Sequence, residues 1–299
     1  MSEQNKIPSD FELASVNSDV LSRPQTGPFT VGSLVRALEQ VFIPEDAEAW
    51  DRTGLVVGDY RQEVSKVAVA LDPTADAVKI AAARGCNVLI THHPPYIESP
   101  DSFAPQGSGA CGSQLAVWQA ISDGVALACF HTALDVSAQA QRVLPSMLGL
   151  DFVRVLHTLG HDDTKGYGQY CRVSQADGSL TLEQLAARCV AVFGRMPRVW
   201  GPPELKLESI VTATGSGGSL VQDCLDANVS CLVCGEVHYH DCVHAAEAEL
   251  SLIELGHDVS ELPLCAVIAA ALGQVGISES EIVLIDQSAN WWTPEATRR

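Results

Sequence analysis

The sequence predicts an α/β protein built from two α/β subdomains, each with a mostly parallel or mixed sheet flanked by helices. Short apolar runs typical of buried strands alternate with amphipathic helical patterns from residue 31 to residue 287. The chain has 299 residues and a hydrophobic content of 46%, which suits one large or two medium-sized domains and is ample for a buried core.

The first subdomain is predicted at residues 29–156. It follows a polar segment, 1–28, without a helix or strand period, which we expect to be flexible. Helices are predicted from apolar stripes and strands from short apolar runs, and Gly85 ends the second helix. In chain order the elements are a helix at 31–42, a strand at 66–72, a helix at 74–85, a strand at 87–91, a loop at 101–112, a helix at 113–124, a strand at 125–130 and a mostly helical stretch at 136–149.

The second subdomain is predicted at residues 157–299, and its first stretch, 157–172, is predicted to connect the two subdomains. Its elements continue the same alternation, and the C-terminal ones are candidates to return to the first subdomain. They are a helix at 179–194, a strand at 209–215, a helix at 218–229, a strand at 230–236, a helix at 241–250, a strand at 251–256, a helix at 261–274, a strand at 281–287 and a tail at 291–299.

The charge of the chain excludes some classes of partner. A formal net charge of −19 argues against sequence-independent binding of nucleic acids or anionic membranes, which requires Lys and Arg surfaces. The sequence has no apolar run long enough to cross a bilayer, and its N-terminus lacks the features of a signal peptide. We therefore expect a cytoplasmic protein.

The ten cysteines are predicted to be reduced thiols that fill the core. Cys231 and Cys234 form the sequence CLVC, which matches half of a zinc knuckle. No second such pair follows it, and the run VSCLVC is typical of a buried strand, so structural zinc is not expected there.

Histidines and carboxylates follow four of the predicted strands. The four loops contain His92 and His93; His131 and Asp135; Glu236, His238, His240 and Asp241; and His257 and Glu261. Because ligands of open α/β sheets bind outside the carboxyl ends of the strands, these loops are expected to converge on one crevice. Imidazoles with carboxylates suit iron, zinc, manganese or nickel, and a shared carboxylate suits a dinuclear centre.

The adjacent His92 and His93 favour two ions over one. Neighbouring side chains on an extended backbone diverge, so each imidazole can serve a different ion, while the two following prolines fix the backbone. Glu261 is the candidate bridging ligand. We expect Ser260 to cap a helix that begins there, so that Glu261 lies in its first turn, and Asp135 to open the helix that follows it.

The stretch TATGSGGSLVQD (212–223) is a glycine loop between a predicted strand and helix. Such a loop either makes a tight turn or presents backbone N–H groups to a phosphate. It lacks the Gly-Lys-Ser/Thr of a P-loop.

Together these motifs resemble the Nif-three-like dinuclear metal-centre family, also called GTP cyclohydrolase 1 type 2 homologues. The resemblance rests on PEDAEAWDRTGLVVGD (44–59), on the THHP and HTALDVS stretches, on GSGGS through GEVHYHD, and on ELGHDVSE. Trp50 and Asp51 match a family motif, whereas Arg52 stands where the family usually has Asn.

The resemblance implies two divalent metal ions per chain. It makes His92, His93, Asp135 and His257 ligands and Glu261 the bridging ligand. His131 would be a ligand or lie beside the ligands, and Glu236 and His240 would line the site. It further implies a ring-like homohexamer with metal sites that face an internal cavity.

The first functional hypothesis is a metal-dependent hydrolase that activates a water molecule against a small substrate, a nucleotide or another phosphoester. Glu236, His131 and His240 are the candidates for proton transfer. The family label suggests ring opening of GTP. The alternatives are a non-catalytic metal-handling or scaffold protein, or a set of core and capping histidines without metal.

Overall fold

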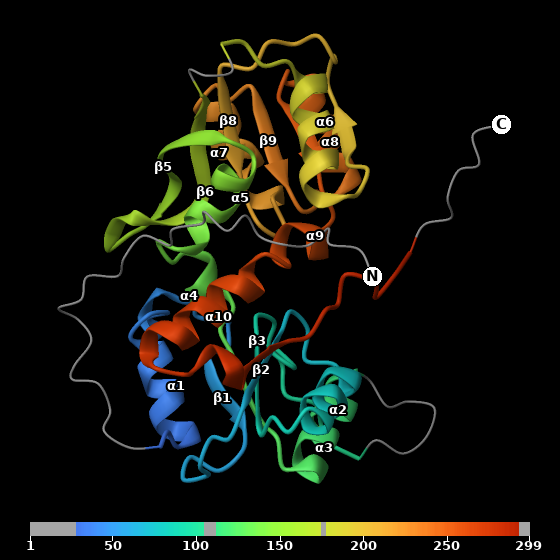
Figure 1. Ribbon diagram of the computed structural model, residues 1–299. Helices are drawn as coiled ribbons and strands as arrows, with labels where there is room; N and C mark the ends of the chain where they lie inside the picture. Colours follow the sequence, from blue (N-terminus) through green and yellow to red (C-terminus); the bar gives the residue numbers. More distant parts are fainter. Residues whose placement is uncertain (1–27, 105–111, 175–177, 293–299) are drawn as a thin grey trace.

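Two sheets, each covered by helices on both faces, form the framework of the computed structural model, which describes residues 28–104, 112–174 and 178–292. The sheets lie in two lobes, one above the other in Figure 1, and the short helix α9 (His257–Glu261) lies where the lobes meet. The predicted fold class, α/β with two mixed sheets flanked by helices, is confirmed.

The first sheet has the strand order β1-β4-β3-β2-β11, with every pair parallel except β1 with β4. Its strands are β1 (Gly54–Val57), β2 (Val67–Ala70), β3 (Val88–Thr91), β4 (Ala126–Cys129) and β11 (Ile282–Leu284). The four helices on its faces are α1 (Val31–Glu39), α2 (Ala75–Ala83), α3 (Gly112–Asp123) and α10 (Leu264–Val275).

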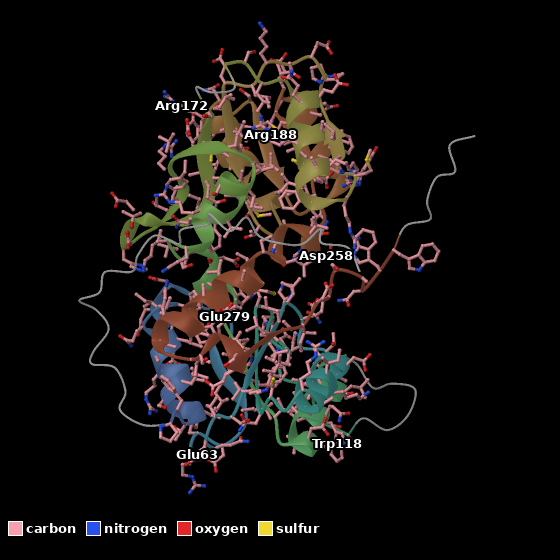
Figure 2. All side chains as sticks on the ribbon, viewed as in Figure 1. Glu63, Trp118, Arg172, Arg188, Asp258 and Glu279 are labelled. Carbon is pink, nitrogen blue, oxygen red and sulfur yellow. The ribbon has the colours of Figure 1, made fainter. Side chains whose placement is uncertain are left out.

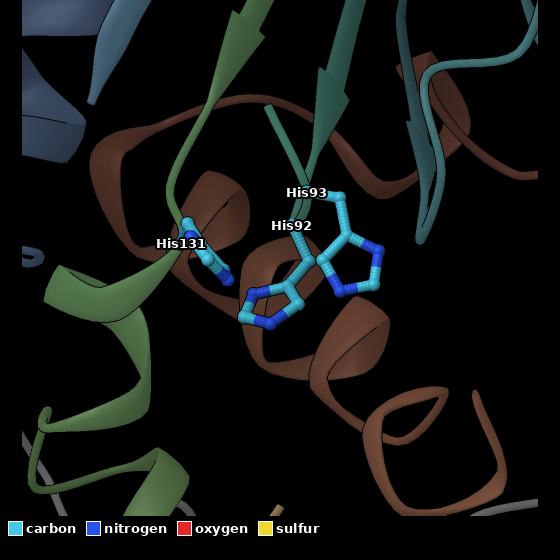
Figure 3. Close-up of side chains that lie close together, drawn as sticks. All are labelled: His92, His93 and His131. Atoms are coloured by element: carbon cyan, nitrogen blue, oxygen red, sulfur yellow. The ribbon is translucent and has the colours of Figure 1, made fainter. Parts of the chain in front are cut away.

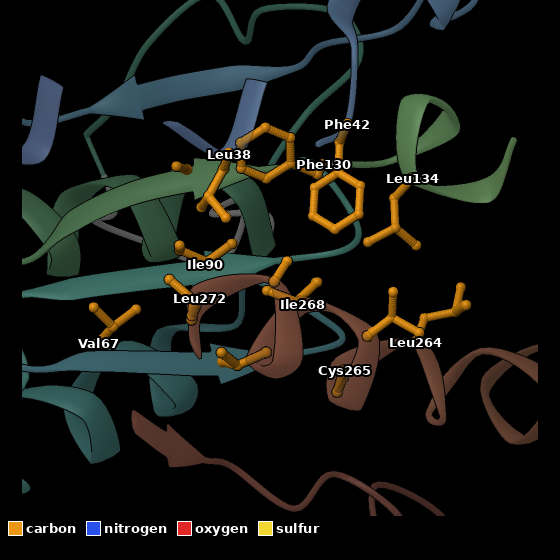
Figure 4. Packing of buried hydrophobic residues seen from close by; sticks show 14 of the residues in the cluster. Leu38, Phe42, Val67, Ile90, Phe130, Leu134, Leu264, Cys265, Ile268 and Leu272 are labelled. Atoms are coloured by element: carbon orange, nitrogen blue, oxygen red, sulfur yellow. The ribbon is translucent and has the colours of Figure 1, made fainter. Parts of the chain in front are cut away.

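Strand alternation divides this lobe into three layers. Val67 and Val69 pack in the core that contains α1 and α10, whereas Ala68 and Ala70 pack in the core that contains α2 and α3. Figure 4 shows the first of these cores. Because both faces are buried, the central strands consist of continuous apolar runs.

The second sheet has the order β5-β6-β8-β9-β10-β7 and is parallel only from β8 through β9 to β10. Its strands are β5 (Leu150–Leu159), β6 (Asp162–Val173), β7 (Arg198–Trp200), β8 (Ser209–Thr212), β9 (Cys231–Cys234) and β10 (Ser251–Glu254). Helix α6 (Leu182–Phe193) packs on one face, and α7 (Val221–Asp226) and α8 (Tyr239–Glu247) pack on the other.

The stretch 157–172, predicted to be a connection between subdomains, is instead part of a long antiparallel hairpin. β5 and β6 pair from Leu150 with Val173 to Leu159 with Asp162, and the predicted boundary at 156/157 falls inside β5. Most of β5 is exposed or half-buried, so it shows no continuous apolar run. The short strands β1 and β7, each at the edge of its sheet, were also not predicted.

The stretch predicted as mostly helical at 136–149 is divided. A turn, α4 (Thr132–Asp135), precedes a 3-10 segment at Ala140–Arg142 and α5 (Val143–Met147). The Ser137 hydroxyl accepts from the Ala140 amide at 3.2 Å, and the Gln141 side chain donates to the Val136 carbonyl at 2.9 Å. Such local side-chain bonds compete with a continuous helix.

The C-terminal part of the chain returns to the first lobe, where β11 pairs with β2. Beyond β11, the Trp291 indole donates to Asp258 Oδ2 at 2.9 Å and lies under the Arg195 guanidinium at 4.0 Å. The predicted N-terminal tail, most of the loop at 101–112 and the last residues of the C-terminal tail lie outside the described residues.

The helical stretch His257–Val275 passes a length and composition test for a membrane span. Half of its apolar window is buried inside the protein, and α10 packs on the first sheet. We therefore interpret this stretch as a core helix of the folded lobe.

The nine described cysteines are all buried and free. Burial raises the pKa of Cys171 and of Cys189 to about 12, so these thiols stay protonated in the folded protein. We expect a thiol-reagent titration without reductant to find all ten cysteines in the unfolded protein and far fewer in the native one. Fewer than ten in the unfolded protein would indicate a disulfide and contradict this prediction.

Candidate metal centre

The centre lies where the carboxyl ends of β3 and β4 face α9. His92 and His93 directly follow β3, and His131 follows β4 by one residue, so the parallel strands bring three imidazoles together (Figure 3). His257 and Glu261 lie one helical turn apart on α9. Ligand atoms of His92, His93 and His131, and likewise of His93, His257 and Glu261, lie within 4.8 Å of one another.

The buried carboxylate of Glu261 faces different residues with its two oxygens. Oε2 lies 3.0 Å from His93 Nε2 and 3.2 Å from His257 Nε2. Oε1 lies 3.6 Å from His92 Nε2, which in turn lies 3.7 Å from Asp135 Oδ1. One carboxylate therefore faces two groups of candidate metal ligands, which we call the two groups of donors: His93 with His257, and His92 with Asp135.

Each imidazole of the centre is held through Nδ1, which leaves Nε2 directed inward. His92 Nδ1 lies 3.2 Å from the Phe130 carbonyl, and three carboxylates hold the other rings. These pairs are His93 Nδ1 with Asp72 Oδ1 at 2.8 Å, His131 Nδ1 with Asp51 Oδ1 at 2.9 Å, and His257 Nδ1 with Glu236 Oε1 at 3.1 Å. An N–H donated to such partners places the free lone pair on Nε2, as in metal-binding histidines.

Two buried atoms of the centre have no hydrogen-bond partner among the described residues. They are His92 Nε2 and Glu261 Oε2. Although His93 Nε2 lies 3.0 Å from that carboxylate oxygen, the contact lacks hydrogen-bond geometry. Unsatisfied buried polar atoms are costly, and a cation between imidazole nitrogens and carboxylate oxygens would satisfy both. The donor set therefore fits a divalent metal ion.

The charges of the centre also favour a cation. Burial opposes protonation of His93, but its hydrogen bond to Asp72 and the nearby Glu261 carboxylate raise its pKa to about 10. The Glu261 carboxylate, 3.2 Å from His257 Nε2, raises the pKa of His257 to about 9. Although burial alone would raise the pKa of Glu261, the surrounding imidazoles hold it well below its usual range. Protons thus balance the buried carboxylate in the chain alone, and a bound metal would displace them.

Asp51 anchors the β4 side of the centre. Its carboxylate accepts from His131 at 2.9 Å, from the Thr132 amide at 2.9 Å and from the Thr132 hydroxyl. Burial opposes its ionisation, but these bonds lower its pKa to about 2. Asp51 therefore stays charged and fixes the orientation of His131.

We expect Asp72→Asn to weaken metal binding by about 10- to 100-fold, because the carboxylate fixes the tautomer and orientation of His93. Competition with a chelator of known affinity measures the loss. The matched control is Asp76→Asn, an exposed residue of α2 that pairs with Lys79. Equal affinities of the two variants would show that Asp72 does not support the centre.

The glycine loop serves close packing against the centre. Gly215 has φ +59°, and a Cβ there would overlap Glu261 Oε1 and lie 3.4 Å from His257 Nε2. The amide of Gly215 donates to Ser260 Oγ at 2.8 Å, and that of Gly217 donates to the Glu236 carbonyl at 2.9 Å. Two of the amides that a phosphate cradle would use are therefore already engaged.

The predicted helix caps are wrong. Ser260 lies inside α9, where its hydroxyl donates to the His257 carbonyl, and Glu261 is the last residue of α9 instead of the first turn of the following helix. Asp135 likewise ends the turn α4, which begins directly after His131. Both acids nevertheless reach the centre, because the short helices that carry them begin three residues after a strand ends.

The predicted proton-transfer residues occupy different surroundings. Glu236 is exposed and holds His257, while His131 is one of the converging imidazoles. His240 is exposed on α8, and its ring packs against Tyr239, which in turn packs against Trp200. The described ring contact of His240 is therefore with Tyr239 of the same helix, and none of its described contacts is with a residue of the centre.

The sequence reasoning missed several supporting residues. Asp72 was not proposed, although it follows β2 as His93 follows β3, and the parallel register places the two side by side. Thr214 donates to Asp135 Oδ1 at 3.3 Å. Tyr167 of β6 has a buried hydroxyl without a hydrogen-bond partner in the described part of the chain, and burial, with Glu48 and Asp135, raises its pKa. No local sequence pattern indicates Thr214 or Tyr167.

This chain has relatives among known proteins. A sequence model of the protein family described as Duf34/NIF3 (NGG1p interacting factor 3) matches residues 29–290. A protein of Streptomyces coelicolor named GTP cyclohydrolase 1 type 2 homolog is 31% identical over 255 residues, which cover 82% of this chain and 86% of that protein.

Two solved structures show the same fold. The Staphylococcus aureus hypothetical protein SA1388 superposes with a TM-score of 0.79 and 21% identity, covering 90% of this chain and all of that one. A Bacillus cereus protein related to NIF3 has a TM-score of 0.78 and 16% identity, covering 88% of this chain and 98% of that chain.

Proposed function

The chain belongs to the Duf34/NIF3 (NGG1p interacting factor 3) family, and from this premise we propose that it is a metal-dependent hydrolase with two divalent ions between its lobes. The observation that carries the proposal is the division of the Glu261 carboxylate between two groups of donors. His93 and His257 face one oxygen, while His92 and Asp135 lie on the side of the other.

The different partners of His92 and His93 support two ions. The rings are neighbours in sequence, yet His92 Nε2 lies near Asp135 and His93 Nε2 lies near Glu261 Oε2. A single ion bound at one imidazole would leave the other imidazole and its carboxylate partner without a metal. Iron, zinc, manganese and nickel all suit such a set of imidazoles and carboxylates.

Two divalent ions, once bound, would make a water molecule nucleophilic and polarise the substrate. The residues of the chain supply orientation and proton transfer. Asp51, Asp72 and Glu236 hold three imidazoles in position. Glu236 uses one oxygen for this purpose, and its exposed carboxylate can accept a proton from solvent or substrate.

The names of the relatives make GTP the first substrate to test, followed by other phosphoesters. The test combines metal content per chain, on protein purified without chelator, with a hydrolysis assay on GTP and a phosphoester panel. About two ions with metal-dependent turnover would support the proposal. Two ions without turnover would favour the alternative of a metal-handling protein, and no metal even after reconstitution would overturn the proposal.

We also propose that the protein is cytoplasmic and assembles into a ring-like homohexamer, with no nucleic-acid or membrane partner. Family membership supports the assembly, and the net charge of −19 supports the absence of polyanionic partners. Native mass spectrometry tests the assembly, and a monomer at micromolar concentration would contradict it.

A further inference from the structure

The tryptophan at position 50 is exposed directly beside the metal centre. The residue is 55% exposed, although large aromatic residues are usually well buried. The indole lies 5.9 Å from the His131 ring in an edge-to-face arrangement. His131 in turn lies 5.1 Å from the His92 ring, so the indole is one ring removed from the candidate ligands.

The backbone that carries Trp50 is firmly held. The Glu48 amide donates to the Thr132 hydroxyl at 3.0 Å, and the Asp51 amide donates to the Glu48 carbonyl at 2.9 Å. The Asp51 side chain is bound to His131 and Thr132. The backbone is fixed and the indole has only two rotatable side-chain bonds. Binding a ligand therefore costs the tryptophan little conformational entropy.

A positively charged residue, Arg52, follows Trp50 by two positions in the chain. The Arg52 guanidinium lies 4.9 Å from the centroid of the Tyr96 ring, and its Nε donates to the Ile97 carbonyl at 2.7 Å. These contacts hold the loop after His93 against the turn that carries Trp50. In a chain with a net charge of −19, Arg52 offers an anionic group of a ligand a local partner at this rim.

We propose that Trp50 is the stacking platform for the substrate of the metal centre, and that the substrate is a planar heteroaromatic ring that carries an anionic group. Every such ring has a π-face that can stack on an indole, and the anionic group would lie toward Arg52. The proposal rests on the proposed function in that it places this ring at the same centre. It assigns Trp50 to binding, with no part in proton transfer.

The test compares two probes that share a sugar phosphate but differ in the ring, guanosine 5′-monophosphate and ribose 5-phosphate. Calorimetric titration of the full-length, metal-reconstituted protein gives both dissociation constants. We expect the ring to improve binding by about tenfold or more. Trp50→Ala should abolish this preference and Trp50→Phe should keep most of it.

The matched control is Trp118→Ala. Trp118 is 51% exposed on α3, at the foot of the lower lobe and far from the lobe junction near Asp258 (Figure 2). This variant should keep the preference of the unmodified protein. A preference that survives in Trp50→Ala, or that is absent from the unmodified protein, would overturn the proposal.

Metal content of the same samples separates the two proposals. Absence of metal counts against the dinuclear centre, whereas a full complement of metal without a Trp50-dependent ring preference counts against the platform alone. Far-ultraviolet circular dichroism of each variant confirms that it is folded.

Discussion

Glu261→Gln is expected to lose most of the bound metal on both sides of the centre. The carboxylate presents Oε2 to His93 and His257 and Oε1 to His92, so the substitution replaces one of these oxygens with an amide group and removes the negative charge that both sides share. A glutamine side chain is neutral, and its amide nitrogen has no lone pair available for a cation. Metal content per chain, measured by plasma mass spectrometry before and after reconstitution, gives the result.

Two further variants separate a bridging role from damage to the fold. Glu261→Asp keeps the charge but shortens the side chain by one methylene, so we expect it to reach one group of donors and to retain about one ion per chain. Glu247→Gln, on the exposed face of α8, should retain both ions. A folded Glu261→Gln protein that still holds two ions per chain would refute the bridging role.

The central strands and the residues at their ends could be predicted because both depend on local pattern. A strand buried on both faces is a continuous apolar run, as at Val88–Thr91, and polar residues directly after it emerge at the carboxyl edge of the sheet. Convergence of His92, His93 and His131 then follows from parallel pairing. That His92 and His93 serve different ions, with Glu261 between them, was inferred from the adjacent imidazoles and the shared carboxylate. The full ligand set, with Asp135 and His257, came from the family resemblance.

Features that depend on tertiary contact could not be predicted in the same way. The hairpin of β5 and β6 carries polar residues on its exposed surfaces and resembles a loop in sequence. The Phe130 carbonyl that orients His92 has no sequence signal at all. Asp72 is different, because the sequence shows a carboxylate at the end of a predicted strand. Only the strand register, however, shows that this carboxylate meets His93.

The second large effect is expected from Gly215→Ala, which should remove metal although it changes no ligand. The added Cβ would overlap Glu261 Oε1, so the carboxylate must turn away from the position in which it faces His92. The left-handed backbone at φ +59° adds a cost of about 1–2 kcal/mol for any residue with a Cβ. Metal affinity should therefore fall further than the stability of the fold.

Gly194→Ala is the control that separates these two costs. Gly194 has φ +68° at the end of α6, and a Cβ there would meet no atom within 4 Å. Both variants should lower the melting temperature by similar amounts because they share the backbone penalty, whereas only Gly215→Ala should lose metal in a chelator competition. Equal metal affinities in the two variants would mean that Glu261 can bind from another position. The glycine would then serve only the turn, and the close approach of the loop to the carboxylate would have no role in holding the metal.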